Sequence, residues 1–410
     1  MATGLQIPRV IKKKSRNEKL IFLLLNILFI YYAFYGLVIF LGPMDPMSLQ
    51  NPNTDVRLKL IDELILSMVL FLLLIENFKI KQNNLIVIIL SSIVFLIVIT
   101  LREMGGSSTN LLFFKSLLIS CIVCMALSHI SSKLAYEIFI NFIHANILAV
   151  LISFAIFIYS PYLAYGGRLL GNYANPNTSS FVYLILFIYL NTFYKRFYRS
   201  SSIHNLLFWR VNAYRAIFLI GLITCLSKIY LALFGVYIII NRPMLVVGSG
   251  IITIGGLTLF GANIIPDLNL VLVEFFDSNT FVNRIVSFET TYDLLSDIRL
   301  ILIGGNCDDC NAYVSDATIV NLVHYFGLIC TFFIFAILFI PMILAIVNNG
   351  ERYQEVNLFK HYLICCALLI SSFFHYSLEI QPSQLLFVWY TQFPVWVAKK
   401  RRWEQEYNEL

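Results

Sequence analysis

Residues 20–41 read LIFLLLNILFIYYAFYGLVIFL and contain no charged side chain. A helix that crosses a bilayer needs about 20 consecutive apolar residues, so this run is long enough to span one. A basic segment, residues 12–16 (KKKSR), precedes it, and no small-x-small cleavage site follows it. The run is also too long for the core of a cleavable signal peptide. We therefore expect an uncleaved first span that begins on the cytoplasmic side.

Similar apolar runs recur along the 410 residues, of which 59% are hydrophobic and only 13% are charged. Soluble domains average about 25% charged residues. The runs are too long for the short alternating strands of a membrane barrel. The sequence thus predicts one all-α polytopic membrane domain, residues 1–410, with about twelve transmembrane helices and both ends in the cytoplasm. The expected spans are 20–42, 58–76, 85–101, 110–128, 138–160, 177–194, 211–226, 229–241, 244–265, 317–340, 360–378 and 385–398.

Charge placement orients these spans. The net charge is +6, but the basic residues cluster at the chain ends and in short loops. This is the positive-inside pattern of membrane proteins, and it argues against a nucleic-acid partner. Five glycines within 244–265 fit close helix packing better than a phosphate-binding loop.

Residues 266–316 form the longest stretch that lacks an apolar segment able to span, and the topology makes it one large outer loop. Its ionisable side chains are Asp267, Glu274, Asp277, Arg284, Glu289, Asp293, Asp297, Arg299, Asp308, Asp309 and Asp316. A transporter would place charged groups along its spans, so charges gathered in one loop favour an enzyme working at one membrane face. Cys307 and Cys310 suit a disulfide or a redox motif. Zinc is disfavoured, because no second Cys or His pair has suitable spacing. We expect neither a metal nor a cofactor, although the acidic side chains of the loop leave metal binding open.

A second outer loop, residues 161–176, contains Gly166-Gly167-Arg168-Leu169-Leu170-Gly171 and leads into Asn175-Pro176-Asn177. Asn175 is a favoured helix N-cap, and Pro176 suits the first helical position. Free N–H groups and the positive end of the helix dipole would favour an anion there. Arg168 could add a bidentate grip on phosphate oxygens. The alternative is an ordinary helix cap beside a solvated Arg168.

Other candidate residues have equally plain alternatives. Ser227-Lys228 separates two apolar runs, where the chain should turn, and Lys228 either binds a ligand or extends to lipid headgroups. Arg284 and Arg299 either bind an anion or pair with neighbouring carboxylates. His324 lies in the tenth predicted span and is either a buried, hydrogen-bonded histidine or a catalytic one.

Several short motifs, taken in order, resemble bacterial O-antigen polymerases and ligases. Gly304-Gly305, then Ser315-Asp316, then a helix with Tyr325-Phe326-Gly327-Leu328 is similar to the closing segment of that family. So are Arg168-x-x-Gly171 with Asn175-Pro176-Asn177, and Ser227-Lys228, where the family has Ser-Arg. Arg284 looks like the family's essential loop arginine. The resemblance covers about residues 160–340. Ligases of the family have a His, followed by an Asn, eleven residues before the helix glycine. Counted back from Gly327, this position is Asp316, and the lack of a His favours a polymerase.

The resemblance implies a glycosyltransferase C-like fold in the bacterial inner membrane, with the active site facing the periplasm. The implied reaction joins undecaprenyl-diphosphate-linked oligosaccharide units into a polysaccharide. The donor is the growing glycan and the acceptor is one repeat unit, and each is attached to its own undecaprenyl diphosphate. The catalytic residues would be Asp316, Arg284 and Arg168, and the substrate-binding residues Asn175, Asn177, Lys228, Arg299, His324 and Glu289. A chain-length regulator protein remains open as a partner. The alternatives are an O-antigen ligase, which transfers glycan to lipid A–core, and a flippase for the lipid-linked unit.

Overall fold

The computed structural model of the chain describes six helices and a few short stretches between and after them. The helices are α1 (Arg16–Leu41), α2 (Val56–Ile75), α5 (Ser132–Tyr159), α6 (Pro176–Thr192), α8 (His204–Thr224) and α9 (Lys228–Asn241). The other described residues are 122–123, 125–127, 129–131, 169, 171–173, 175, 225–227, 323, 327–329, 331–332 and 366–368. This described part is helical and contains no strand, which confirms the all-α prediction for it. The loop 266–316 lies wholly outside the described residues, and six described helices do not test the twelve-span count.

Each described helix overlaps one predicted span, and all six begin earlier than predicted, α5 and α8 by the most. α5 starts at Ser132 rather than 138, and α8 at His204 rather than 211. The N-cap of α5 explains the first difference, since the N–H of Leu134 donates to Ser131 Oγ at 3.5 Å. The N–H of Ser131 donates in turn to Glu18 Oε1 on α1 at 2.8 Å. A hydropathy pattern locates only the part of a helix suited to hydrocarbon, whereas the cap decides where the helix begins.

Two of the described helices contain a segment that is long and apolar enough to cross a membrane. These segments are Asn17–Leu37 in α1 and Glu137–Ile158 in α5. Their surfaces also differ from those of a soluble bundle. α1 exposes Leu20, Leu23, Ile27 and Ile30 along one stripe, with 42–52% of each side chain accessible. Asn26, Asn146 and Asn172 are buried instead. Apolar side chains outside and amides inside are what a lipid environment favours.

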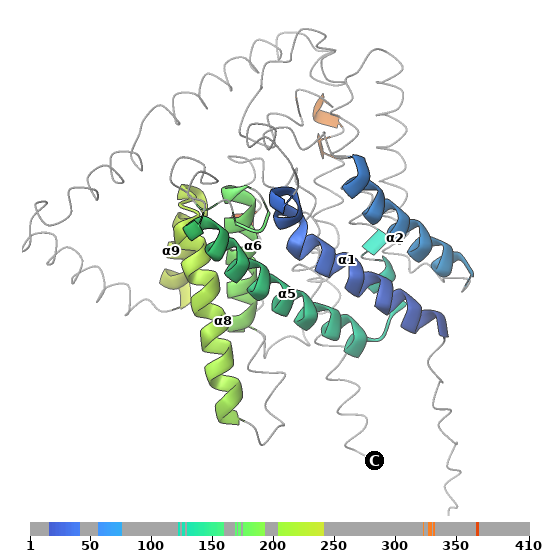
Figure 1. Cartoon of the computed structure of the whole chain (residues 1–410), viewed down its shortest axis with the longest axis horizontal. Helices are drawn as coiled ribbons and strands as arrows, with labels where there is room; N and C mark the ends of the chain where they lie inside the picture. The colour runs from blue at the N-terminus through green and yellow to red at the C-terminus, as the bar shows by residue number, and fades with distance from the viewer. Residues whose placement is uncertain are drawn as a thin grey trace, which may run out of the picture.

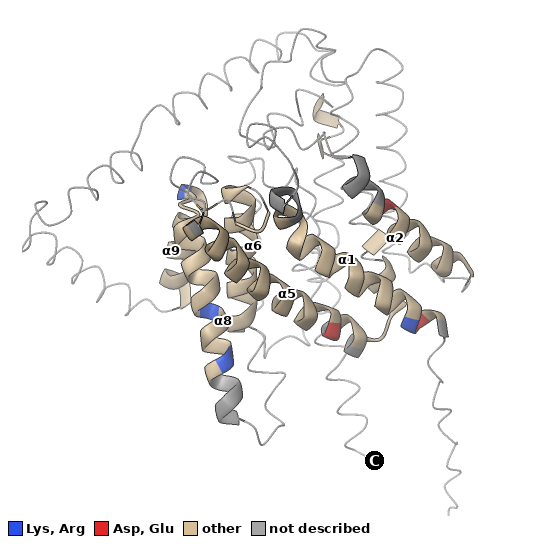
Figure 2. Ribbon diagram, viewed as in Figure 1, with Lys and Arg blue, Asp and Glu red and all other residues tan. Residues whose placement is uncertain are grey.

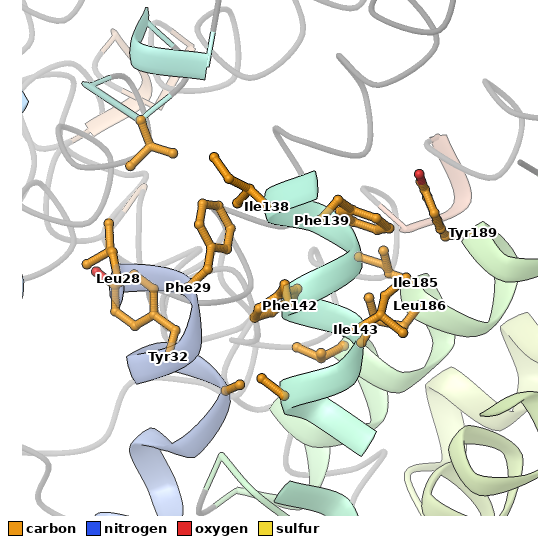
Figure 3. Close-up of a cluster of buried hydrophobic side chains, with 14 of the residues drawn as sticks. Leu28, Phe29, Tyr32, Ile138, Phe139, Phe142, Ile143, Ile185, Leu186 and Tyr189 are labelled. Atoms are coloured by element: carbon orange, nitrogen blue, oxygen red, sulfur yellow. The ribbon is translucent and has the colours of Figure 1, made fainter. Parts of the chain in front are cut away.

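Contacts between side chains fix the direction of neighbouring helices. α1 and α5 run parallel, because Glu18 meets Ser131, Asn26 meets Asn141 and the Phe29 ring packs edge-on against Phe142 (Figures 1 and 3). α6 runs antiparallel to α5, since the Phe139 ring near the start of α5 contacts the Tyr189 ring near the end of α6. The shared core of these three helices is therefore aromatic and aliphatic, as Figure 3 shows.

The last two helices continue the alternation. α8 runs antiparallel to α6, because Arg215 Nη2 donates to the carbonyl oxygen of Leu190 at 3.1 Å while Gly221 lies against the Tyr183 ring. α9 runs parallel to α6, with Phe181 against Tyr230 and Phe187 against Phe234. α1, α5 and α8 consequently end where α6 and α9 begin. We call this the cap end of the bundle, and it is the end that the sequence predicts to face outward.

Candidate site at the start of α6

The first turn of α6 is closed by Asn175. Its Oδ1 accepts the N–H of Asn177 at 2.9 Å and that of Thr178 at 3.2 Å. Its carbonyl oxygen accepts the N–H of Ser179 at 2.9 Å. Pro176, the first helical residue, has no N–H to satisfy. The predicted N-cap is thus confirmed, but the expectation of free N–H groups is wrong for these three residues, because the cap already occupies them.

Gly171 makes the tight turn that precedes this cap. Its φ is +71°, in the left-handed region where side chains other than glycine are strained. A Cβ atom at this position would collide with Ser179 Oγ and would lie 2.8 Å from Tyr183 Oη. Only glycine therefore allows the loop to lie directly against the first two turns of α6.

Asn172 is the centre of a buried hydrogen-bond network. Its Nδ2 donates to the carbonyl oxygen of Ala33 at 2.6 Å and to Asn146 Oδ1 at 3.1 Å. Its Oδ1 accepts the hydroxyl of Tyr183 at 2.6 Å, and its carbonyl oxygen accepts the N–H of Gly36 at 2.9 Å. One side chain thereby ties the loop to α1, α5 and α6. Because buried amides are costly unless they are satisfied, this network fixes the loop in one position.

Tyr173 extends the network toward α5. Its hydroxyl donates to Asn146 Oδ1 at 2.7 Å, and its N–H donates to Ser179 Oγ at 3.4 Å. Burial raises the pKa of Tyr173 well above its ordinary value, so the phenol keeps its proton and remains a donor. Sequence reasoning missed Asn146, Asn172 and Tyr173. The available signal was an asparagine inside the apolar run of α5 and a second one directly after Gly171.

The turn between α8 and α9 meets the start of α6, as the Ser227-Lys228 break in the sequence suggested. Ser227 Oγ donates to Asn177 Oδ1 at 2.8 Å. Leu226 has a φ of +48°, which turns the chain sharply before α9 begins at Lys228. Two predicted binding residues, Asn177 and Lys228, are thus brought to the same end of the bundle, one at the start of α6 and the other at the start of α9. Among the described residues, two helix N-termini and one ammonium group bring positive charge to this end, and Figure 2 shows the basic residue at the start of α9.

Six of the predicted site residues lie outside the described part of the chain: Arg168, Arg284, Glu289, Arg299, Asp316 and His324. The backbone next to Arg168 is nevertheless anchored, because the N–H of Leu169 donates to the carbonyl oxygen of Thr224 at 3.1 Å. The loop therefore passes the end of α8 at the cap end. Among the described residues, no group of three His, Cys, Asp or Glu side chains could hold a metal ion.

Replacing Asn175 should test its role as the N-cap of α6. We expect Asn175→Ala to lower the free energy of unfolding by about 1 kcal/mol, the usual cost of losing an N-cap. Asn175→Ser should be nearly neutral, because serine caps equally well. Thermal unfolding of the purified protein in detergent would measure both. Unchanged stability of the alanine variant would contradict the structural role of Asn175.

No family model matches the chain, and searches of curated proteins and of solved structures likewise found no match.

Proposed function

We propose that this protein is an O-antigen polymerase of the bacterial inner membrane, working on undecaprenyl-diphosphate-linked repeat units at the periplasmic face. The observation that carries the proposal is the ordered set of motifs between about residues 160 and 340. The described members of that set support it by their proximity. Gly171 packs against Ser179 and Tyr183 in the first two turns of α6, which Asn175 caps. The Ser227-Lys228 turn joins the same helix start through the hydrogen bond from Ser227 to Asn177.

The proposed reaction is a displacement at the anomeric carbon of the donor. A hydroxyl oxygen of the acceptor sugar bonds to that carbon, the bond to the diphosphate oxygen breaks, and undecaprenyl diphosphate leaves. Cations must hold the charge that develops on the leaving group, and a base must take the proton of the attacking hydroxyl. Arg168 and Arg284 suit the first task, assisted by Lys228 and Arg299. Asp316 suits the second, with His324 and Glu289 as the other candidate bases.

The N–H groups at the start of α6 are already hydrogen-bonded, and this limits which groups can bind the diphosphate. The cap leaves the helix dipole in place but uses the N–H donors of Asn177, Thr178 and Ser179 within the chain. Direct bonds to the diphosphate would then have to come from side-chain cations. Guanidinium groups are the best suited, because each can grip two phosphate oxygens at once.

Deleting the gene and examining the lipopolysaccharide would test the proposal. A polymerase defect leaves lipid A–core carrying a single repeat unit, and a plasmid-borne copy should restore the long chains. Bare core with accumulated lipid-linked polymer would instead identify a ligase. Bare core without polymer on the outer face would identify a flippase.

Substituting both arginines by lysine should weaken the reaction strongly. Each lost charge-assisted bond is worth about 1–3 kcal/mol. The Arg168→Lys, Arg284→Lys double variant keeps the net charge but should make shorter polymer chains at a lower rate. Arg352→Lys, in a predicted cytoplasmic loop, is the matched control and should behave as wild type. Gel profiles of the polymer and rates in isolated membranes would measure the effect. Wild-type profiles from the double variant would remove both arginines from the site.

A further inference from the structure

Arg210 lies in the first half of α8, the half away from the cap end, and contacts the middle of α5. Its Nε donates to Tyr214 Oη at 2.8 Å, and its Nη2 lies 2.9 Å from His144 Nε2 on α5. Because a guanidinium group only donates, His144 Nε2 accepts this bond. The guanidinium carbon also lies 5.4 Å from the centre of the Tyr214 ring. The side chain is nevertheless exposed to the surroundings, so its position is fixed before any ligand arrives.

The level of Arg210 along the bundle follows from its neighbour Arg215. Arg215 donates to the carbonyl oxygen of Leu190, close to the end of α6 at Thr192. Arg210 lies five residues closer to the start of α8, which is about 7.5 Å along the helix axis. By this count its Cα lies level with or beyond the end of α6, while its guanidinium reaches His144 in the middle of α5. Its neighbour Trp209 is 74% exposed, and exposed Trp beside Arg is typical of the membrane–water boundary.

One exposed apolar stripe runs from this point along α8. Its members are Trp209, Ala213, Ala216, Ile220 and Ile223, spaced so that they lie on one face of the helix. From Ala213 to Ile223 the stripe is about 15 Å long at about 1.5 Å per residue. This length equals half of the hydrocarbon core of a bilayer, which is about 30 Å thick. Figure 2 shows the basic segments of α8 in the first half of the helix, away from the start of α9.

We propose that Arg210 and Trp209 bind the phosphate headgroup of an anionic phospholipid, one of whose acyl chains lies along the stripe from Ala213 to Ile223. A phosphodiester offers oxygens that match a fixed guanidinium, and the apolar stripe suits one leaflet's depth of acyl chain. A soluble phosphate would gain nothing from that stripe. The inference rests on the chain lying in a membrane, and it is independent of the polymerase proposal because neither Arg210 nor Trp209 belongs to the proposed active site.

Lipid retention measures this site directly. The full chain would be placed in nanodiscs of phosphatidylcholine with a minor share of phosphatidylglycerol, and the lipids retained after transfer to detergent would be counted by native mass spectrometry. Wild type should retain phosphatidylglycerol preferentially. Arg210→Gln should lower that preference about fivefold, the usual effect of one basic residue near an anionic surface. Tyr214→Phe, which keeps the charge but loses the Nε–Oη bond, should give an intermediate loss.

Lys19→Gln is the matched control. Lys19 is an exposed basic residue near the start of α1, where Glu18 bonds to Ser131 just before α5. Its loss should leave the preference for phosphatidylglycerol nearly unchanged. The proposal fails if wild type shows no preference, if Lys19→Gln reduces the preference as much as Arg210→Gln does, or if Tyr214→Phe and Arg210→Gln both retain the full wild-type preference.

Discussion

An Asp316→Asn variant is expected to lose roughly 10²–10⁴-fold in polymerisation rate, the usual contribution of general base catalysis. In the proposed site, Asp316 lies where the loop 266–316 is predicted to re-enter the membrane at the tenth span. A carboxylate there could take the proton of an acceptor hydroxyl, whereas an amide could not. The measurement is the rate of polymer formation in membranes supplied with lipid-linked repeat units. Protein levels and substrate binding should match wild type.

Asparagine is the informative replacement because it separates two roles. Asp and Asn cap helices about equally well, so an Asp316 that only capped the tenth span would tolerate the change with little effect. Asp316→Ala would harm either role and therefore decides nothing alone. A fully active Asp316→Asn protein would exclude Asp316 as the base and direct the search to His324 and Glu289.

Local chemistry made the start of α6 predictable. An Asn-Pro pair ahead of an apolar run specifies a cap through contacts within four residues of chain, and the structure has Asn175 and Pro176 in those roles. The turn at Ser227-Lys228 was equally visible, because a polar pair breaks two apolar runs there. What local chemistry could not predict was that Ser227 would bond to Asn177, since these residues are separated by 50 positions in the chain.

Long-range pairing also hid the network around Asn172. Its two amide bonds reach Ala33 and Asn146, which are separated from it by 139 and 26 positions. In a single sequence, Asn146 is one polar residue within an apolar run, and no periodicity shows which helix faces it. The energetic reasoning holds in retrospect, because an asparagine buried in a bundle needs a partner. The identity of the partner is a property of the packing.

The same packing holds the backbone next to Arg168, a residue of the proposed site, in one position. Leu169 is bonded to the end of α8, Asn172 to α1, and Tyr173 to α5 and α6. A binding group works best when the surrounding side chains hold its backbone. The described residues between Leu169 and Asn175 thus serve the proposed site mainly by fixing the backbone position. From the sequence, this loop was expected mainly to supply side chains that bind the substrate.

Gly171→Ala is expected to lower the free energy of unfolding by about 2–5 kcal/mol. Two costs add. Alanine at a φ of +71° is strained by about 1–2 kcal/mol, and its Cβ would overlap Ser179 and crowd Tyr183 Oη, where overpacking typically costs about 1–3 kcal/mol. Thermal unfolding in detergent and the yield of folded protein would measure the loss.

Gly235→Ala provides the matched control, since nothing lies within 4 Å of the Cβ that it would add in the middle of α9. That variant should be as stable as wild type or slightly more stable, because alanine favours a helix over glycine. A second change distinguishes the two costs at Gly171. Ser179→Gly in the Gly171→Ala background removes the overlapping side chain but not the backbone strain, so it should restore only part of the stability. If Gly171→Ala unfolds at the wild-type temperature, the loop does not pack against α6 as described. The inference that this packing fixes the backbone next to Arg168 would then be wrong as well.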